Sequence, residues 1–158
     1  MKQKILMDDF GECDPFILIA IHCALEDYRL VYMLNRKLNL KLKRKKEDLD
    51  YSEAKYSIFE WEDPNELITW SVVSNYCRVE QGIENNKSSL FGNQVNIPKT
   101  YHLVSEYRSA DYLLKIMNQT LFFNEQEIID ELLSIPQIVL AYGIETENLK
   151  SKTNLIFN

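Results

Sequence analysis

A polar stretch in the second half of the chain concentrates side chains that could do chemistry. The sequence VSEYRSADYLLKI, from Val104 to Ile116, contains Glu106, Asp111 and Tyr112 ahead of an apolar run. Two carboxylates can act as general acid and general base when their environments separate their pKa values. Acidic side chains are common at strand ends, so a small enzyme using Glu106 and Asp111 is the third of our three hypotheses. Further acidic candidates are Glu60, Glu62 and Asp63.

The motifs that usually carry nucleotide binding or nucleophilic catalysis do not occur in the sequence. The four glycines form neither a GxGxxG nor a GxxxxGK[ST] loop, and no serine lies in a GxSxG motif. The two histidines, His22 and His102, leave few partners for a nucleophile. The sequence therefore predicts no cofactor and favours a protein that is not an enzyme.

Cysteine and histidine side chains could in principle bind a metal ion, but their spacing argues against it. Structural zinc sites normally include a close pair such as C-x2-C or H-x3-H. The adjacent residues His22 and Cys23 would point to opposite sides of a strand. We therefore predict buried cysteines and no metal site. The candidate ligands are Cys13, His22, Cys23, Cys77 and His102.

A basic run follows the first predicted helix, although the protein has a net charge of −6. The run KLKRKKEDLD, residues 41–50, could contact RNA phosphates or an acidic protein. The more ordinary interpretation is a solvated edge strand that Glu47, Asp48 and Asp50 neutralise. The possible partner-binding residues are Lys41, Lys43, Arg44, Lys45 and Lys46.

Composition places the chain among globular proteins. A length of 158 residues predicts a single domain, residues 1–158, and the 46% hydrophobic and 27% charged fractions are ordinary. Three cysteines do not make a secreted disulfide framework, so a reducing compartment fits better. The N-terminal sequence has no long apolar region of a signal peptide, and FILIAIHCAL is too short for a membrane span. We expect a soluble cytoplasmic protein without membrane contact.

Hydrophobic periodicity predicts a strand, a helix and an edge strand in the first third. Residues 16–21 are continuously apolar, which is typical of a strand buried on both faces. Apolar residues then recur at helical spacing over 25–39. Over 38–43 leucines alternate with Asn39 and lysines, which predicts an edge strand.

The middle of the chain predicts a hairpin. Two aromatic and β-branched runs within residues 54–75 flank a turn at Asp63, Pro64 and Asn65. We assign the aromatic side chains to core and cross-strand packing rather than to a ligand site. The aromatic residues nearest the basic run do not form an RNP-like RNA-binding motif. The aromatic residues concerned are Tyr51, Tyr56, Phe59, Trp61, Trp70 and Tyr76.

The second half alternates irregular and regular segments. Residues 80–99 predict a long polar loop, and residues 110–117 a strand. Asn124 with Glu127 three residues on resembles a capping box for a helix that ends at Ile135-Pro136. A last strand is expected over 137–142, followed by a tail, 145–158, that could pair weakly. The order predicts an α+β domain: a mostly antiparallel sheet with two main helices packed on one face, a two-layer sandwich.

Three segments resemble one known family. VSE, three residues and then ADY keep the spacing of a signature of which Glu106, Asp111 and Tyr112 match, while Val104, Ser105 and Ala110 replace Ile, Pro and Val. LEDYRLVYMLNRKLNL is similar to the family's N-terminal helix and LKSKTNLIF to its C-terminal end. The resemblance is to the IPExxxVDY family of the Bacteroidota, which has no established activity to transfer. Without the proline, the signature lacks a fixed φ at that position.

We expect the matching residues to be structural anchors. Asp27 or Arg29 could pair with Glu106, Asp111 or Tyr112 and tie the first helix to the sheet. The predicted anchors are Asp27, Tyr28, Arg29, Glu106, Asp111 and Tyr112.

Two functional hypotheses come before the enzyme. The first is a non-enzymatic cytoplasmic binding or accessory protein whose partner is a protein. The second is an RNA- or ribosome-associated factor that uses the basic segment 36–46.

Overall fold

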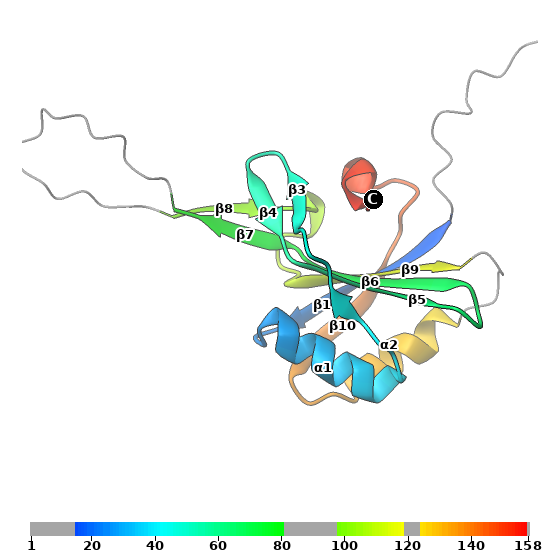
Figure 1. Cartoon of the computed structure of the whole chain (residues 1–158). Coiled ribbons are helices and arrows are strands. Elements are labelled where there is room, and N and C mark those ends of the chain that lie inside the picture. The colour runs from blue at the N-terminus through cyan, green and yellow to red at the C-terminus, as the bar shows by residue number, and fades with distance from the viewer. Residues whose placement is uncertain (1–14, 81–97, 119–123, 158) are drawn as a thin grey trace, which may run out of the picture.

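The computed structural model describes residues 15–80, 98–118 and 124–157 (Figure 1). Its centre is a six-stranded sheet in the order β10-β1-β9-β6-β5-β2, with every neighbouring pair antiparallel. The hairpin predicted within 54–75 is the β5–β6 pair, in which Trp61 lies opposite Trp70. The strands are β1 (Phe16–Cys23), β2 (Lys43–Arg44), β5 (Ile58–Asp63), β6 (Ile68–Ser74), β9 (Tyr112–Asn118) and β10 (Ile138–Ile144).

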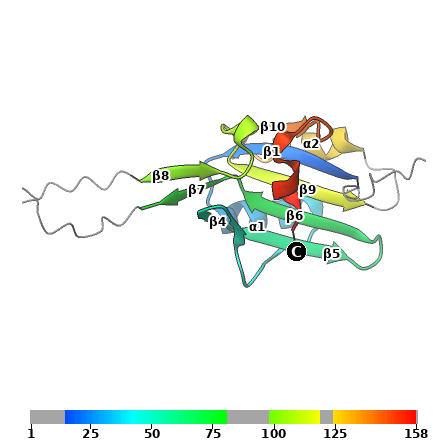
Figure 2. The same cartoon turned by 90° about the horizontal axis from the view of Figure 1, so that it is seen from above.

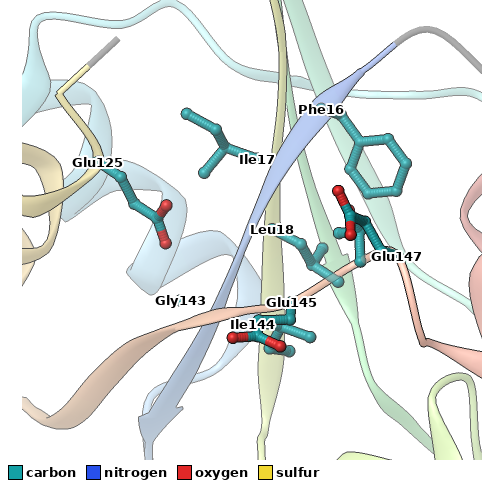
Figure 3. A pocket seen from close by; sticks show the side chains of 9 residues that line it. Phe16, Ile17, Leu18, Glu125, Gly143, Ile144, Glu145 and Glu147 are labelled. Carbon is teal, nitrogen blue, oxygen red and sulfur yellow. The ribbon is translucent and has the colours of Figure 1, made fainter.

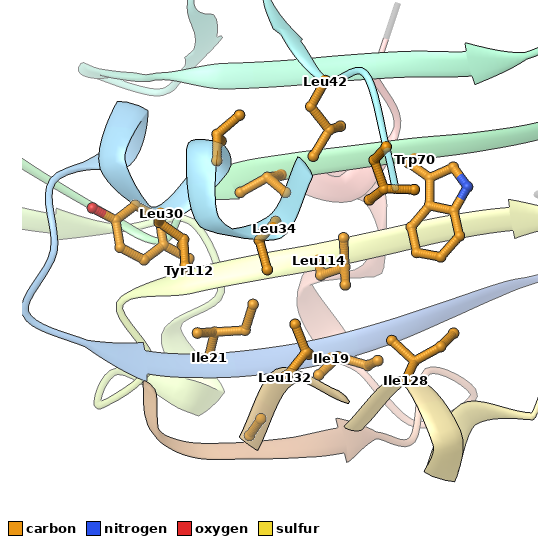
Figure 4. Close-up of a cluster of buried hydrophobic side chains, with 14 of the residues drawn as sticks. Ile19, Ile21, Leu30, Leu34, Leu42, Trp70, Tyr112, Leu114, Ile128 and Leu132 are labelled. Carbon is orange, nitrogen blue, oxygen red and sulfur yellow. The ribbon is translucent and has the colours of Figure 1, made fainter. Parts of the chain in front are cut away.

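Two helices, α1 (Asp27–Leu38) and α2 (Glu125–Leu133), cover one face of this sheet (Figure 1). The predicted α+β class and the placement of both helices on one face are confirmed. The Asn124 side chain accepts a hydrogen bond from the Glu127 N–H, so the predicted cap of α2 is also confirmed. Between helices and sheet lies a cluster of buried apolar side chains (Figure 4). Its fully buried members include Ile19, Ile21, Leu30, Leu34, Leu114 and Leu132.

The second face of the sheet is buried too, under a smaller layer that the two-layer prediction did not contain. Hairpin β3–β4 and the C-terminal η2 lie above the sheet in Figure 1. A second apolar cluster, which includes Leu18, Tyr56 and Leu155, fills the space beneath them. This layer explains why β1 is apolar on both faces. Its elements are β3 (Leu49–Tyr51), β4 (Ala54–Tyr56), β7 (Tyr76–Val79), β8 (Lys99–His102) and the 3-10 helices η1 (Ser105–Tyr107) and η2 (Lys150–Leu155).

Three predicted segments need comment. The strand expected over 38–43 is wrong in extent, because only Lys43 and Arg44 pair, with β5. The tail expected to pair weakly is also wrong, because it forms η2 and buries Leu155 completely. Most of the predicted polar loop, residues 81–97, lies outside the described residues.

Candidate functional site

The signature stretch is built around a buried residue that sequence reasoning did not find. Asn75 is fully buried, and its side-chain oxygen accepts a hydrogen bond from the Val104 N–H at 2.9 Å. Its side-chain nitrogen donates to the carbonyls of Tyr107 and Ala110 at 2.9 and 3.0 Å. The backbone N–H of Asn75 donates to the Asp111 carbonyl. One asparagine therefore fixes the loop that presents the signature.

Asp111 and Tyr112 tie β9 to the connection between β1 and α1. The Asp111 carboxylate accepts a hydrogen bond from the Cys23 N–H at 2.9 Å. The buried Tyr112 hydroxyl donates to the Leu25 carbonyl at 2.6 Å, and it points to that connection in Figure 4. Burial raises the pKa of this phenol. Both side chains are structural anchors, but they hold backbone groups rather than the predicted Asp27 or Arg29.

The predicted anchors in α1 have other contacts. The Asp27 carboxylate accepts from the Tyr28 N–H at 2.7 Å and lies 3.9 Å from an Arg44 nitrogen. The Arg29 guanidinium lies 6.0 Å from the centroid of the Tyr28 ring, and both side chains are exposed. Tyr28 and Arg29 therefore belong to the outer surface of the helix.

Glu106 holds the C-terminal segment. Its carboxylate accepts hydrogen bonds from the Ser151 hydroxyl and from the Ser151 N–H, the second at 3.2 Å. The hydrogen bond from the hydroxyl lowers the pKa of Glu106. Asn154 adds a 2.8 Å bond to the Leu103 carbonyl. The signature thus fastens η2 through Glu106 and β1 through Asp111, so its two carboxylates serve different segments.

A buried lysine completes the fastening of the C-terminal segment. The Lys115 ammonium donates to the Leu155 carbonyl at 2.5 Å. It also lies 4.8 Å from the centroid of the Phe16 ring and 4.7 Å from that of Phe157. Aromatic faces and a carbonyl oxygen stabilise a cation that burial would otherwise disfavour. In the sequence, Lys115 lies within the apolar pattern of a predicted strand, and no neighbouring residue indicates this contact.

His22 and Cys23 point to opposite faces of the sheet, as predicted. A ring nitrogen of His22 lies 3.2 Å from the Tyr142 hydroxyl, while Cys23 belongs to the core under the helices. Burial raises the pKa of the Cys23 thiol, which disfavours the reactive thiolate. Among the described residues, no three histidine, cysteine or acidic side chains gather as metal ligands, and Cys13 lies outside them.

The basic run is partly neutralised. Arg44 forms a 2.6 Å contact with Asp48, and the Lys45 ammonium lies 3.8 Å from Glu60. These contacts agree in part with the ordinary interpretation of the run as a solvated edge. Lys41, Lys43 and Lys46 are exposed, and no carboxylate of the described residues lies within 4.0 Å of their ammonium groups.

The chain after α1 folds back along the helix. Asn39 ends α1 in the left-handed conformation at φ 53°. The Asn35 side chain then accepts from the Leu42 N–H at 3.0 Å and donates to the Leu42 carbonyl at 3.2 Å. Farther on, Arg44 reaches Asp27 in the first turn. The basic segment therefore runs beside the helix stripe that contains Asp27 and Asn35.

The neighbouring stripe of α1 carries exposed tyrosines and arginines. Successive helical residues are turned by about 100°, so Tyr28, Tyr32 and Arg36 lie one position around from the Asp27 and Asn35 stripe. Tyr28 and Tyr32 are 56% and 59% exposed. The Arg36 guanidinium lies 5.7 Å from the Tyr32 ring centroid. We call Tyr28, Arg29, Tyr32, Arg36, Lys41 and Lys43 together the tyrosine–arginine surface.

Three of the cavities on the described part of the molecule bear on the candidate sites. One of about 490 Å³ lies beside β1 and the end of β10, where Glu125, Glu145 and Glu147 line it (Figure 3). Another of about 600 Å³ lies between residues 45–50 and the C-terminal segment. The third, of about 320 Å³, adjoins the tyrosine–arginine surface at Arg36. Its lining consists of Met33, Arg36, Lys37, Ser134, Ile135 and Pro136.

The third cavity differs from the first in its charge. Met33, Ile135 and Pro136 give it an apolar wall, and Arg36 and Lys37 also line it, with the Lys37 ammonium 3.5 Å from Glu131. The first cavity would repel anions, because its charged side chains are carboxylates. Neither Glu106 nor Asp111 lines any of these three cavities. The hydrogen bonds of Glu106 and Asp111 give both carboxylates a structural role.

No helix in the described ranges is long and apolar enough to cross a membrane. Comparisons of the chain with protein-family models, with curated proteins and with solved structures found no match.

Proposed function

We propose that this protein is a non-enzymatic cytoplasmic binding protein that contacts a protein partner through the tyrosine–arginine surface. The observation that carries the proposal is the pair Tyr28 and Tyr32, one helical turn apart and both more than half exposed. Single exposed aromatic residues are ordinary on protein surfaces. Two in one stripe, each with an arginine near its ring, resemble the side chains that dominate protein interfaces.

The chemistry of the surface favours a protein over a nucleic acid. Single-stranded nucleic acids stack their bases on free aromatic faces. Of the aromatic residues that follow the basic run, Tyr56 and Phe59 are buried and cannot stack on bases, whereas Tyr51 is 42% exposed. Arginines already lie near the rings of Tyr28 and Tyr32. The apolar cavity beside Arg36 would accept an aliphatic side chain, which a protein has and a nucleic acid lacks.

The charge of the tyrosine–arginine surface indicates which kind of protein partner it would bind. Lys41 and Lys43 have no carboxylate of the described residues within 4.0 Å, and Arg36 adds a third exposed cation. The rest of the protein is acidic, with a net charge of −6. A partner with acidic side chains around an apolar one complements this local charge. We expect its association to weaken as the salt concentration rises.

The test is affinity capture from a native lysate with three matched baits. The Tyr28→Ser/Tyr32→Ser double variant removes the aromatic rings, and Tyr51→Ser removes a similarly exposed tyrosine from β3. We expect the wild type and Tyr51→Ser to retain the same protein, and the double variant to lose at least about tenfold of it. Equal retention by all three baits would refute this surface, and no reproducible protein would refute the proposal.

RNA binding is the second candidate, because Lys41, Lys43 and Lys46 are exposed without a nearby carboxylate among the described residues. If this hypothesis is right, we expect the protein to bind RNA at low salt, with an affinity that decreases steeply as the ionic strength rises. Neutralising Lys43, Arg44, Lys45 and Lys46 should abolish the affinity. Nuclease treatment of the captured material separates the two candidates, because only an RNA-mediated interaction would disappear.

We also propose membership of the IPExxxVDY family. The three matching signature residues, Glu106, Asp111 and Tyr112, each form a tertiary hydrogen bond through the side chain. Val104 and Ala110, which depart from the signature, are buried apolar residues, so they keep the character of the Ile and Val they replace. A structure of an undisputed member would test this assignment. An equivalent of Glu106 that did not contact the C-terminal segment would argue against it.

A further inference from the structure

The C-terminal segment, residues 149–157, is attached to the protein differently from the strands. In the described residues, its backbone hydrogen bonds form within residues 146–156, and no strand pairs with it. The hydrogen bonds that fasten it to other elements each involve a side chain. The segment can therefore detach without breaking a ladder of the main sheet. The bonded pairs are Glu106 with Ser151, Asn154 with the Leu103 carbonyl, and Lys115 with the Leu155 carbonyl.

The apolar packing of this segment is complete on one side only. Figures 1 and 2 together show η2 above the main sheet, across β9. Leu149 and Leu155 are buried in the second apolar cluster. Ile156, by contrast, is 47% exposed, and with Phe157 it lines the cavity of about 600 Å³. The end of the segment thus borders a hollow instead of a filled core.

The segment covers a buried amine. Lys115 of β9 is 5% exposed. The Leu155 carbonyl that accepts from its ammonium and the Phe157 ring that lies 4.7 Å away both belong to the segment. A reagent must reach the amine in order to react with it. The reactivity of Lys115 therefore reports whether the segment is in place.

Glu106 holds the beginning of η2 at the margin of the contact. Its carboxylate accepts from the Ser151 N–H at 3.2 Å and from the Ser151 hydroxyl, and both bonds are exposed to solvent. Hydrogen bonds to an ionised group are about twice as strong as those between neutral groups. A change at Glu106 therefore alters how firmly the segment is held without altering the apolar packing around Leu155.

We propose that residues 149–157 are a releasable cover, which detaches as one unit before the rest of the protein unfolds. In the open state, water reaches Lys115 and the side chains of the second apolar cluster. The core between the helices and the sheet stays packed, because it lies on the opposite face. The cover thus controls access to the second face of the sheet. The inference does not depend on the tyrosine–arginine surface.

Amine labelling of the full chain with an N-hydroxysuccinimide ester, followed by mass spectrometry, tests the proposal. We expect wild-type Lys115 to react at least about tenfold more slowly than the exposed Lys41. Glu106→Gln should raise the Lys115 rate at least about threefold, because it weakens the bonds to Ser151. Glu66→Gln, at an exposed glutamate in the β5–β6 turn, is the matched control and should leave the rate unchanged. Circular dichroism verifies that each variant folds.

A core variant separates opening of the cover from global unfolding. Ile129→Val shortens a buried side chain between α2 and the sheet, so it lowers the stability to urea. Because that core stays packed in the open state, Ile129→Val should leave the Lys115 rate unchanged. A Lys115 rate that rises in step with the loss of global stability would overturn the proposal, since exposure would then require unfolding. So would a rate that Glu106→Gln leaves unchanged, or one equal to that of Lys41 in the wild type.

Discussion

Asn75 is a fully buried polar residue whose side chain holds a distant loop in place. Its side chain satisfies one N–H and two carbonyl groups of a loop about thirty residues farther along the chain. Nothing in the local sequence SVVSNYC marks it, because the groups it binds come from Val104, Tyr107 and Ala110. A single asparagine between two strands is as typical of an exposed turn as of a buried side chain that hydrogen-bonds to a distant loop.

The Asn75→Ala variant should be strongly destabilised. Removing the side chain takes this partner from the Val104 N–H and the Ala110 carbonyl, while the Tyr107 carbonyl still accepts from the Ala110 N–H. Each buried unsatisfied group costs about 1–3 kcal/mol, so we expect a loss of about 2 kcal/mol or more in the free energy of unfolding, measured by urea denaturation. Asn65→Ala, in the exposed β5–β6 turn, should change it by less than about 0.5 kcal/mol. Equal effects of the two substitutions would contradict the structural role of Asn75.

Glu106 should make stability depend on pH. Its pKa is lowered in the folded protein, so the carboxylate stabilises the fold above its unfolded pKa of about 4.3. This contribution is lost as the pH falls through the lower folded value, because the protonated form cannot keep the charge-assisted bond. Wild type should therefore exceed Glu106→Gln in stability at pH 7, and the difference should shrink at pH 3.

The partner of Glu106 provides the control for that experiment. Ser151→Ala removes the hydroxyl donor, so it should reproduce the effect of Glu106→Gln at pH 7, and the two substitutions together should add little. Urea denaturation of the four proteins at both pH values gives the comparison. A stability difference that is the same at pH 7 and pH 3 would show that the carboxylate charge is not involved.

At the scale of elements, the sequence predicts what depends on local pattern. The apolar run of β1, the helical period of α1, the turn between β5 and β6 and the cap of α2 are all local signals, and each is confirmed. The strand expected over 38–43 fails because the Asn35 side chain takes the N–H and C=O of Leu42 that a strand ladder would use. That competition depends on how the chain folds back along the helix.

The C-terminal segment was mispredicted for a similar reason. Its anchors, Glu106, Lys115 and Leu103, lie in other elements, and its own composition carries no clear period. The residues of the candidate site likewise divide into those that a local pattern predicts and those that only the folded structure brings out. The sequence predicts the basic residues as candidate partner-binding residues. The stripe of Tyr28, Tyr32 and Arg36 becomes a candidate only because the structure shows that both tyrosines are more than half exposed.

The η2 segment should contribute substantially to stability. Leu155 is completely buried in the cluster on the second face of the sheet, and replacing a buried leucine by alanine costs about 2–5 kcal/mol. Its neighbour Ile156 is 47% exposed, so Ile156→Ala should cost less than about 1 kcal/mol. Thermal or urea unfolding compares the two variants. A Leu155→Ala protein as stable as Ile156→Ala would mean that η2 does not pack as described.

At the scale of the whole molecule, the polar anchors and the proposed partner-binding surface lie on different elements. The signature residues fasten β1 and η2 to the rest of the fold, while the tyrosine–arginine surface lies along α1 and β2. β2 and β10 are the two opposite edges of the main sheet.

The most direct test of the proposed function is photo-cross-linking from the surface itself. A photoreactive phenylalanine analogue at position 32 replaces an exposed tyrosine of α1, and the same analogue at position 51 is the control on β3. We predict that, in native lysate, position 32 forms a nuclease-resistant cross-link to a specific protein and position 51 does not. Equal cross-linking from both positions, or none from position 32, would contradict the assignment of this surface.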